Sequence, residues 1–143
     1  MSMGILERLR AEIAGNTELN TLFADRYKKS ATAFVGYKKS PSISQLPCLC
    51  FVPIVRAYED NTANMRHGDR AASILISINE PTEADGIFDG VRYMEQIIDL
   101  IIDIIRSQPF PEVIFKKMRV VSDKGLRHPL YESEIVFSYL EIT

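Results

Sequence analysis

Histidine, cysteine and closely spaced aspartates are the side chains in this chain whose types could do chemistry. His67 and His128 lie far apart in the sequence, in two polar segments that share no motif. A Cys-x-Cys pair with two histidines could nominally hold zinc, but zinc sites favour cysteines two to four residues apart with closely paired partners. Cys48 and Cys50 also share one face of an apolar strand, which is typical of buried structural cysteines.

Asp99 and Asp103 lie one helical turn apart and could act as paired carboxylates. They belong to a polar helix stripe, however, where carboxylates are usually solvated. The sequence has no glycine-rich phosphate loop, no G-x-S-x-G and no H-E-x-x-H. We therefore expect no enzyme, no catalytic residue, no cofactor and no metal.

The totals describe an ordinary globular chain. It has 143 residues, 46% of them apolar and 25% charged, and a net charge of −2. This length is typical of a single domain, 1–143, with a core that needs no disulfides. The charge does not favour a general nucleic-acid binder. The start of the chain lacks the pattern of a secretory signal, and the two cysteines favour a reducing compartment.

Hydrophobic periodicity predicts the order of the elements. Residues 4–14 have a helical apolar stripe, and 17–30 predict a second short helix or a helical turn. Period-two patterns predict strands, and the long amphipathic helix falls within 86–108. The expected strands cover 31–39, 48–60, 70–79, 113–122 and 130–142. The fold class is α+β: a mostly antiparallel sheet, one long amphipathic helix across it and an N-terminal helix alongside.

Three residue patterns qualify individual strands. Gly36 predicts a bulge or bend in the first strand. Pro53 has no N–H group to donate, so it predicts an edge position or a bulge in a strand otherwise suited to burial. The lysines of "KKMR" (116–119) are typical of a solvated edge strand, although they could form a basic patch.

The long helix has the strongest pattern in the chain. Its polar residues form one narrow stripe, and its apolar residues fill an arc roughly 200° wide, whereas a helix on one sheet needs little more than 100°. The apolar run is too short to span a membrane, and Asp99 and Asp103 interrupt it. The extra width predicts a second partner, either the N-terminal helix or another subunit. Ile98, Ile102 and Ile105 on one flank, and Ile97, Leu100 and Ile104 on the other, should not all touch the same layer. We assign the first of these flanks to a subunit or partner interface.

The order of elements resembles the tail terminator (tail completion) proteins of long-tailed bacteriophages and phage-tail-like particles. The resemblance covers nearly all of the chain but contains no single diagnostic motif. It rests on the segments "GILERLRAEI", "LPCLCFVPIVRAYED", "NTANMRHGDR", "RAASILISIN", "GIFDGVRYMEQIIDLIIDIIRSQ" and "RHPLYESEIVFSYLEIT", with an Asp123–Pro129 turn before the last strand.

The resemblance implies a structural virion protein that is assembled in the bacterial host cytoplasm. Its subunits would form a homo-oligomeric ring, a hexamer, that caps the tail tube, ends tail polymerisation and joins the tail to the head connector. DNA would pass through the lumen without specific binding, and no membrane would be involved. The segment in the place of the family's variable interface loop supplies Met65, Arg66, His67, Asp69 and Arg70. A plain solvated loop is the competing interpretation.

Two alternatives remain open on the sequence alone. One is another head–tail joining or tail tube protein. The other is a small ligand-binding domain or enzyme that uses the histidines or the aspartates. A deep pocket in which His67 and His128 face each other would favour the second alternative.

Overall fold

The computed structural model describes residues 2–39, 41–57 and 69–141. These residues form three α-helices, one short 3-10 helix and seven strands. The helices are α1 (Ser2–Ala14), α2 (Thr17–Tyr27), η1 (Ile43–Gln45) and α3 (Asp89–Arg106). The strands are β1 (Thr32–Val35), β2 (Cys48–Ala57), β3 (Asp69–Asn79), β4 (Glu83–Ala84), β5 (Ile87–Phe88), β6 (Val113–Val121) and β7 (Leu130–Glu141).

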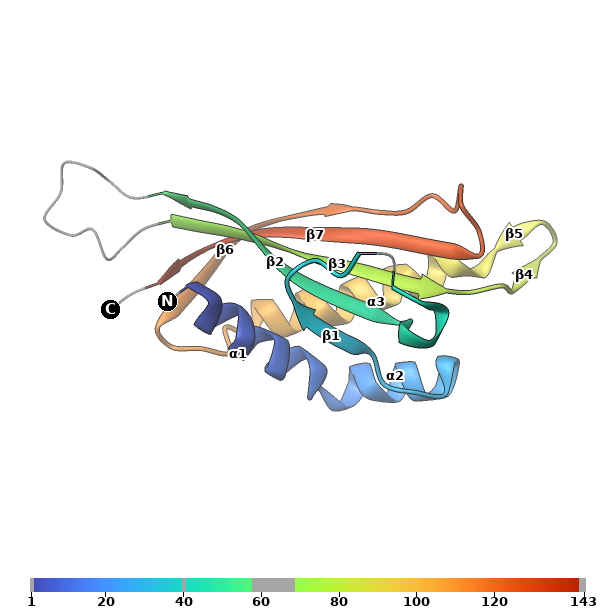
Figure 1. Ribbon diagram of the computed structural model, residues 1–143, viewed down its shortest axis with the longest axis horizontal. Coiled ribbons are helices and arrows are strands. Elements are labelled where there is room, and N and C mark those ends of the chain that lie inside the picture. Colours follow the sequence, from blue (N-terminus) through green and yellow to red (C-terminus); the bar gives the residue numbers. More distant parts are fainter. Residues whose placement is uncertain (1, 40, 58–68, 142–143) are drawn as a thin grey trace, which may run out of the picture.

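Five strands form the main sheet, in the order β1-β2-β3-β7-β6. β1 runs parallel to β2, and the other neighbouring strands are antiparallel. Figure 1 shows α1, α2 and α3 together on one side of this sheet. The α+β prediction is therefore confirmed, including the long helix across the sheet and the N-terminal helix alongside it. The small β4–β5 hairpin was not predicted.

The first two helices follow from local sequence signals. Leu6, Leu9 and Ile13 recur at helical spacing in α1, and all three are buried. Asn16 caps α2, because its side-chain oxygen accepts a hydrogen bond of 2.9 Å from the backbone N–H of Leu19. Lys28 then ends α2 in the left-handed conformation. The segment that the sequence left open between a helix and a turn is therefore a helix.

Pro53 lies in the part of β2 that no longer pairs with β1. β1 pairs with β2 only from Cys48 to Phe51, so β2 is an edge strand at Pro53. The register between β2 and β3 also shifts between Pro53 and Val55. Both parts of the prediction are confirmed, since Pro53 is at an edge and at a bulge. Gly36 has a positive φ of 112° at the bend that ends β1, as its residue type predicted.

Tyr131 and Gly90 join α3 to the last strand. Gly90 lies in the first turn of α3, and Tyr131 of β7 packs directly against its Cα. A Cβ atom at position 90 would overlap the Tyr131 ring. The Tyr131 hydroxyl is itself held by Nδ1 of His128, so the ring has little freedom to move away.

We expect Gly90→Ala to lower the free energy of unfolding by about 3 kcal/mol, because the added methyl group overlaps a fixed aromatic ring. Urea unfolding monitored by circular dichroism measures the change. Gly4→Ala is the matched control: it is also a helical glycine, but nothing lies within 4 Å of its added Cβ. Equal stability of Gly90→Ala and Gly4→Ala would contradict the close contact.

Candidate functional site

The predicted interface loop lies mostly outside the described residues. Met65, Arg66 and His67 are among the residues that the structure does not describe. Asp69 is the first residue of β3, and Arg70 follows it. The guanidinium Nη1 of Arg70 lies 2.9 Å from a carboxylate oxygen of Glu141, and both side chains are largely buried. Arg70 thus joins the start of β3 to the end of β7, and its role in a subunit contact stays a prediction.

The structure changes the interpretation of the α3 flank assigned to a partner. Ile98 and Ile105 are 2% and 0% exposed, so neither side chain reaches the surface of the subunit. Ile102 is only partly buried, and it alone of the three can meet a partner. The physical reason is that α3 packs on β3 and β7 on one side and on α2 on the other. Two parts of the same chain, the sheet and α2, therefore contact the apolar arc, while Leu100, Ile102 and Ile104 stay partly exposed.

The polar stripe of α3 faces away from this core. Its members are all exposed: Arg92, Glu95, Gln96, Asp99, Asp103, Arg106 and Ser107. The prediction that Asp99 and Asp103 face solvent is confirmed. Neither carboxylate has an ion-pair or hydrogen-bond partner in the described part of the chain.

His128 and the two cysteines have structural surroundings. The His128 ring stacks on Phe88 with 3.9 Å between centroids and bonds to the Tyr131 hydroxyl, which ties the β6–β7 turn to β5. Cys48 and Cys50 are buried, with their Sγ atoms 3.9 Å apart. Burial, together with the neighbouring Cys50, raises the pKa of the Cys48 thiol to about 12. Among the residues the structure describes, no group of three or more His, Cys, Asp or Glu side chains is placed to hold a metal ion.

The side of the sheet opposite α1, α2 and α3 forms a further candidate surface, which we name the open face. Strand register places its side chains in three cross-strand rows. The rows are Cys48, Ser77 and Glu132; Cys50, Leu75, Glu134 and Val121; and Val52, Ser73, Val136 and Arg119. Apart from the small cluster of Leu46, Cys48 and Cys50, most of these side chains are partly or fully exposed.

Sequence reasoning had a signal for the open face but did not use it. Residues 48–52 are apolar on both strand faces, which indicates that the second face also meets something. Val52, Leu75 and Val136 sit at the centre of the open face and keep part of their surface accessible to solvent. An antiparallel sheet with a purely solvated outer face would carry polar residues there.

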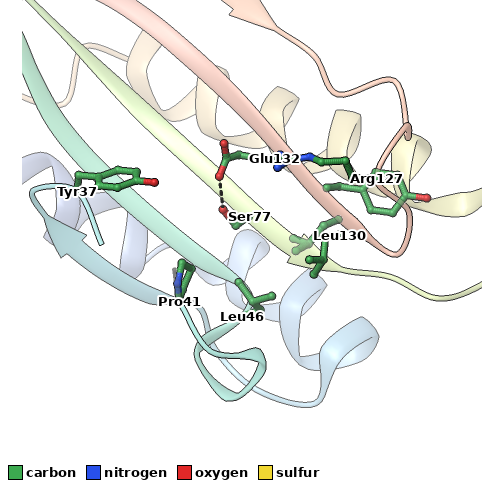
Figure 2. A pocket seen from close by; sticks show the side chains of 9 residues that line it. Tyr37, Pro41, Leu46, Ser77, Arg127, Leu130 and Glu132 are labelled. Carbon is green, nitrogen blue, oxygen red and sulfur yellow. Dashed lines mark hydrogen bonds between the residues drawn. The ribbon is translucent and has the colours of Figure 1, made fainter. Parts of the chain in front are cut away.

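A pocket of about 390 Å³ lies at one end of the open face. Figure 2 shows Tyr37, Pro41 and Leu46 on one side of it and Arg127, Leu130 and Glu132 on the other. Ser77 lies between the two sides and donates a hydrogen bond of 3.3 Å to Glu132. His128 does not line this pocket, and His67 lies outside the described residues. The pocket is thus a shallow polar and apolar recess beside the open face.

A buried ion pair anchors the end of β3 to α2. Glu80 is 3% exposed and accepts hydrogen bonds of 2.8 and 3.0 Å from the Arg26 guanidinium and 2.7 Å from the Thr82 hydroxyl. The guanidinium also lies over the Tyr93 ring of α3, 3.9 Å from its centroid. Burial opposes ionisation of Glu80, but the bonds from Arg26 and Thr82 outweigh it and lower its pKa.

We expect Glu80→Gln to lower the free energy of unfolding at neutral pH by about 2 kcal/mol, because it leaves a partly buried Arg26 without its counter-ion. The pKa of Glu80 is lower in the folded chain, so its contribution is present above pH 4.5, the ordinary glutamate pKa, and is lost as pH falls below it. Unfolding curves at several pH values should therefore show that the free energy of unfolding falls less from neutral to acidic pH for Glu80→Gln than for the wild type.

Glu7→Gln is the control for this measurement, since Glu7 forms an exposed ion pair with Arg10 and should change little. A wild-type chain and a Glu80→Gln chain with parallel pH profiles would contradict the role of the Glu80 carboxylate.

No family model matches this chain, and no curated protein sequence shows significant similarity to it. The fold defines its class: an α+β protein in which, among the described residues, α1, α2 and α3 cover one face of the sheet and not the other. None of the described helices is long and apolar enough to cross a membrane.

Proposed function

We propose that this chain is a structural virion-assembly protein of the tail terminator type. Its subunits form a ring, a hexamer, that caps the tail tube, ends tail polymerisation and meets the head connector. DNA passes through the lumen without specific binding, and the protein is assembled in the host cytoplasm and ends in the virion. Other head–tail joining or tail tube proteins are the nearest alternatives.

The open face is the observation that carries this proposal. Val52, Leu75 and Val136 give it an apolar centre, and no helix covers it in the described part of the chain. Partly exposed apolar side chains at the centre of a sheet are typical of a surface that another protein covers. The order of helices and strands supports the more specific assignment, because it resembles that of the tail terminator family.

The described side chains that could do chemistry have other places in the structure. His128 is engaged with Phe88 and Tyr131, and Asp99 and Asp103 face solvent on α3. The pocket of Figure 2 is the feature that would favour a small ligand instead. Ser77 and Glu132 already bond to each other in it, so a ligand would have to compete for those groups.

Negative-stain imaging of the purified chain mixed with tail tubes tests the proposal. We expect closed rings at tube ends and tubes that stop growing when the chain is added. Native mass spectrometry of the complex then gives the number of subunits. A chain that leaves tube length and tube ends unchanged would contradict the proposal, whereas a monomer in the absence of tubes would not, since assembly can require the tube.

We expect Leu75→Lys to abolish ring assembly while the chain stays folded. Leu75 is only partly buried at the centre of the open face, so a lysine there can reach solvent in the monomer but not in a covered interface. Thr21→Lys, which adds the same charge to the exposed side of α2, is the control and should assemble normally. Circular dichroism verifies that both variants are folded, and rings formed by Leu75→Lys would exclude the open face as the contact.

A further inference from the structure

β6 is the outer strand of the sheet, and one side of its backbone has no strand partner in the described part of the chain. A strand in this position presents N–H and C=O groups that can pair with another chain. Native proteins usually block such an edge by charge, by a bulge or by a covering segment. β6 has all three devices, but they act on different parts of the strand.

Gln108 shows that the backbone groups on the outer side of β6 are open to hydrogen bonding. Its side-chain oxygen accepts a hydrogen bond of 3.1 Å from the N–H of Phe115, and its amide nitrogen donates one of 3.3 Å to the C=O of Phe115. This is the pair of bonds that a residue of an added strand would make. Gln108 reaches this place because α3 has ended and Gln108 itself has a positive φ of 52°.

The next outward-facing groups belong to Met118 and Val120. Phe115, Met118 and Val120 pair with alternate residues of β7, which are Tyr139, Phe137 and Ile135. Residues on alternate positions of an antiparallel strand direct their backbone groups to the same side. Since Phe115 directs its groups outward to Gln108, Met118 and Val120 do so as well. In the described chain, nothing bonds to these groups as Gln108 does at Phe115.

A bulge beside these groups opens a depression on the open face. The register of β6 against β7 shifts between Phe115 and Met118, and Ser138 accepts a hydrogen bond of 3.2 Å from the backbone N–H of Lys117 within the shift. The depression has a volume of about 310 Å³ and is lined by Lys117, Met118, Arg119, Val136 and Phe137, with Ala71 and Ser138. An added strand would therefore have room for side chains next to the edge.

Charge decides what kind of strand fits. Lys117 and Arg119 are exposed, and neither has an ion-pair partner among the described residues. Pairing of β6 with β6 of a second copy would bring these cations together, which is unfavourable. An acidic strand would place carboxylates opposite them. Lys117 and Arg119 therefore select against self-pairing and in favour of an acidic partner.

We propose that the outer edge of β6, from Lys117 to Val121, binds an extended acidic segment of a partner protein by strand addition. The segment pairs with the backbone of Met118 and Val120 and places its carboxylates on the open face, near Lys117, Arg119 and the depression. Its alternate apolar side chains lie on the other face of the strand, beside the partly buried Met118 and Val120. The added strand ends before Phe115, because the Gln108 side chain already bonds to the backbone N–H and C=O of Phe115. This interaction does not depend on ring formation, which is measured separately.

The test uses the full chain and a peptide of about ten alternating glutamate and valine residues, long enough to span the edge at about 3.4 Å per residue. We expect the peptide to shift the backbone amide resonances of Met118 and Val120 in NMR spectra and to slow the hydrogen exchange of both amides. A peptide in which lysine replaces every glutamate should neither shift these resonances nor slow the exchange of these amides.

Three variants separate the contributions. Lys117→Glu/Arg119→Glu should weaken binding of the acidic peptide about tenfold or more, through two reversed charges. Val120→Pro removes one outward N–H at an edge position that tolerates proline, and should weaken binding while the chain stays folded. Lys38→Glu/Lys39→Glu makes the same charge change just beyond β1, at the opposite edge of the sheet, and should bind like the wild type.

Several results would overturn the proposal. One is an acidic peptide that leaves the β6 resonances unchanged at millimolar concentration, and another is equal binding of the basic peptide. Undiminished binding by Lys117→Glu/Arg119→Glu would exclude the charge selection. Resonance shifts without slowed exchange of Met118 and Val120 would show contact with side chains alone and would exclude strand addition.

Discussion

The burial of the α3 isoleucines between the sheet and α2 is the constraint on which the rest of this structure depends. Ile97, Ile98, Ile101 and Ile105 are all 2% exposed or less. They fix α3 across β3 and β7 and hold α2 against its other side. The ion pair of Arg26 with Glu80 closes the same junction with a buried charge. Because α1, α2 and α3 all gather on this side, none of these three helices covers the other face of the sheet.

The two faces of the sheet consequently differ in kind. The face beneath the helices is a closed core of large side chains, such as Phe51, Phe137 and Tyr139. The open face mixes apolar and charged residues and keeps much of its surface accessible. Its edges differ as well: Pro53 and a bulge interrupt β2, whereas β6 is shielded by Gln108 at one point and by cationic side chains further along. Such a division between a buried core and an open face suits the proposed role in assembly.

Local patterns were sufficient to predict most elements. The period-two alternation of residues 70–79 and 130–142 and the helical wheel of 86–108 correspond to β3, β7 and α3 within a few residues. Pro53 and the lysines of 116–119 predicted edge positions, because the chemistry of a missing N–H or of an exposed charge is local. The wide apolar arc of α3 indicated two partners, and the structure shows two within the chain, the sheet and α2. A further subunit contact on this arc stays a prediction.

Contacts between distant residues could not be predicted in this way. Periodicity does not show which residues meet, so the contact of Gly90 with Tyr131, the pair of Arg26 with Glu80 and the amide bonds of Gln108 all required the topology. The open face had a partial signal in the apolar residues 48–52, but its extent depends on where the helices lie. Residues 65–67 have no periodic pattern from which a position could be derived.

The central claim is that the open face becomes buried when the chain assembles. Hydroxyl-radical footprinting of the isolated chain and of the chain bound to tail tubes measures this directly, because oxidation follows side-chain exposure. The account predicts that oxidation of Val52, Leu75 and Val136 falls strongly on assembly. Leu126 serves as the reference, because it is 88% exposed in the β6–β7 turn and lies outside the three cross-strand rows of the open face. Unchanged oxidation of all three residues in the bound chain would contradict the account.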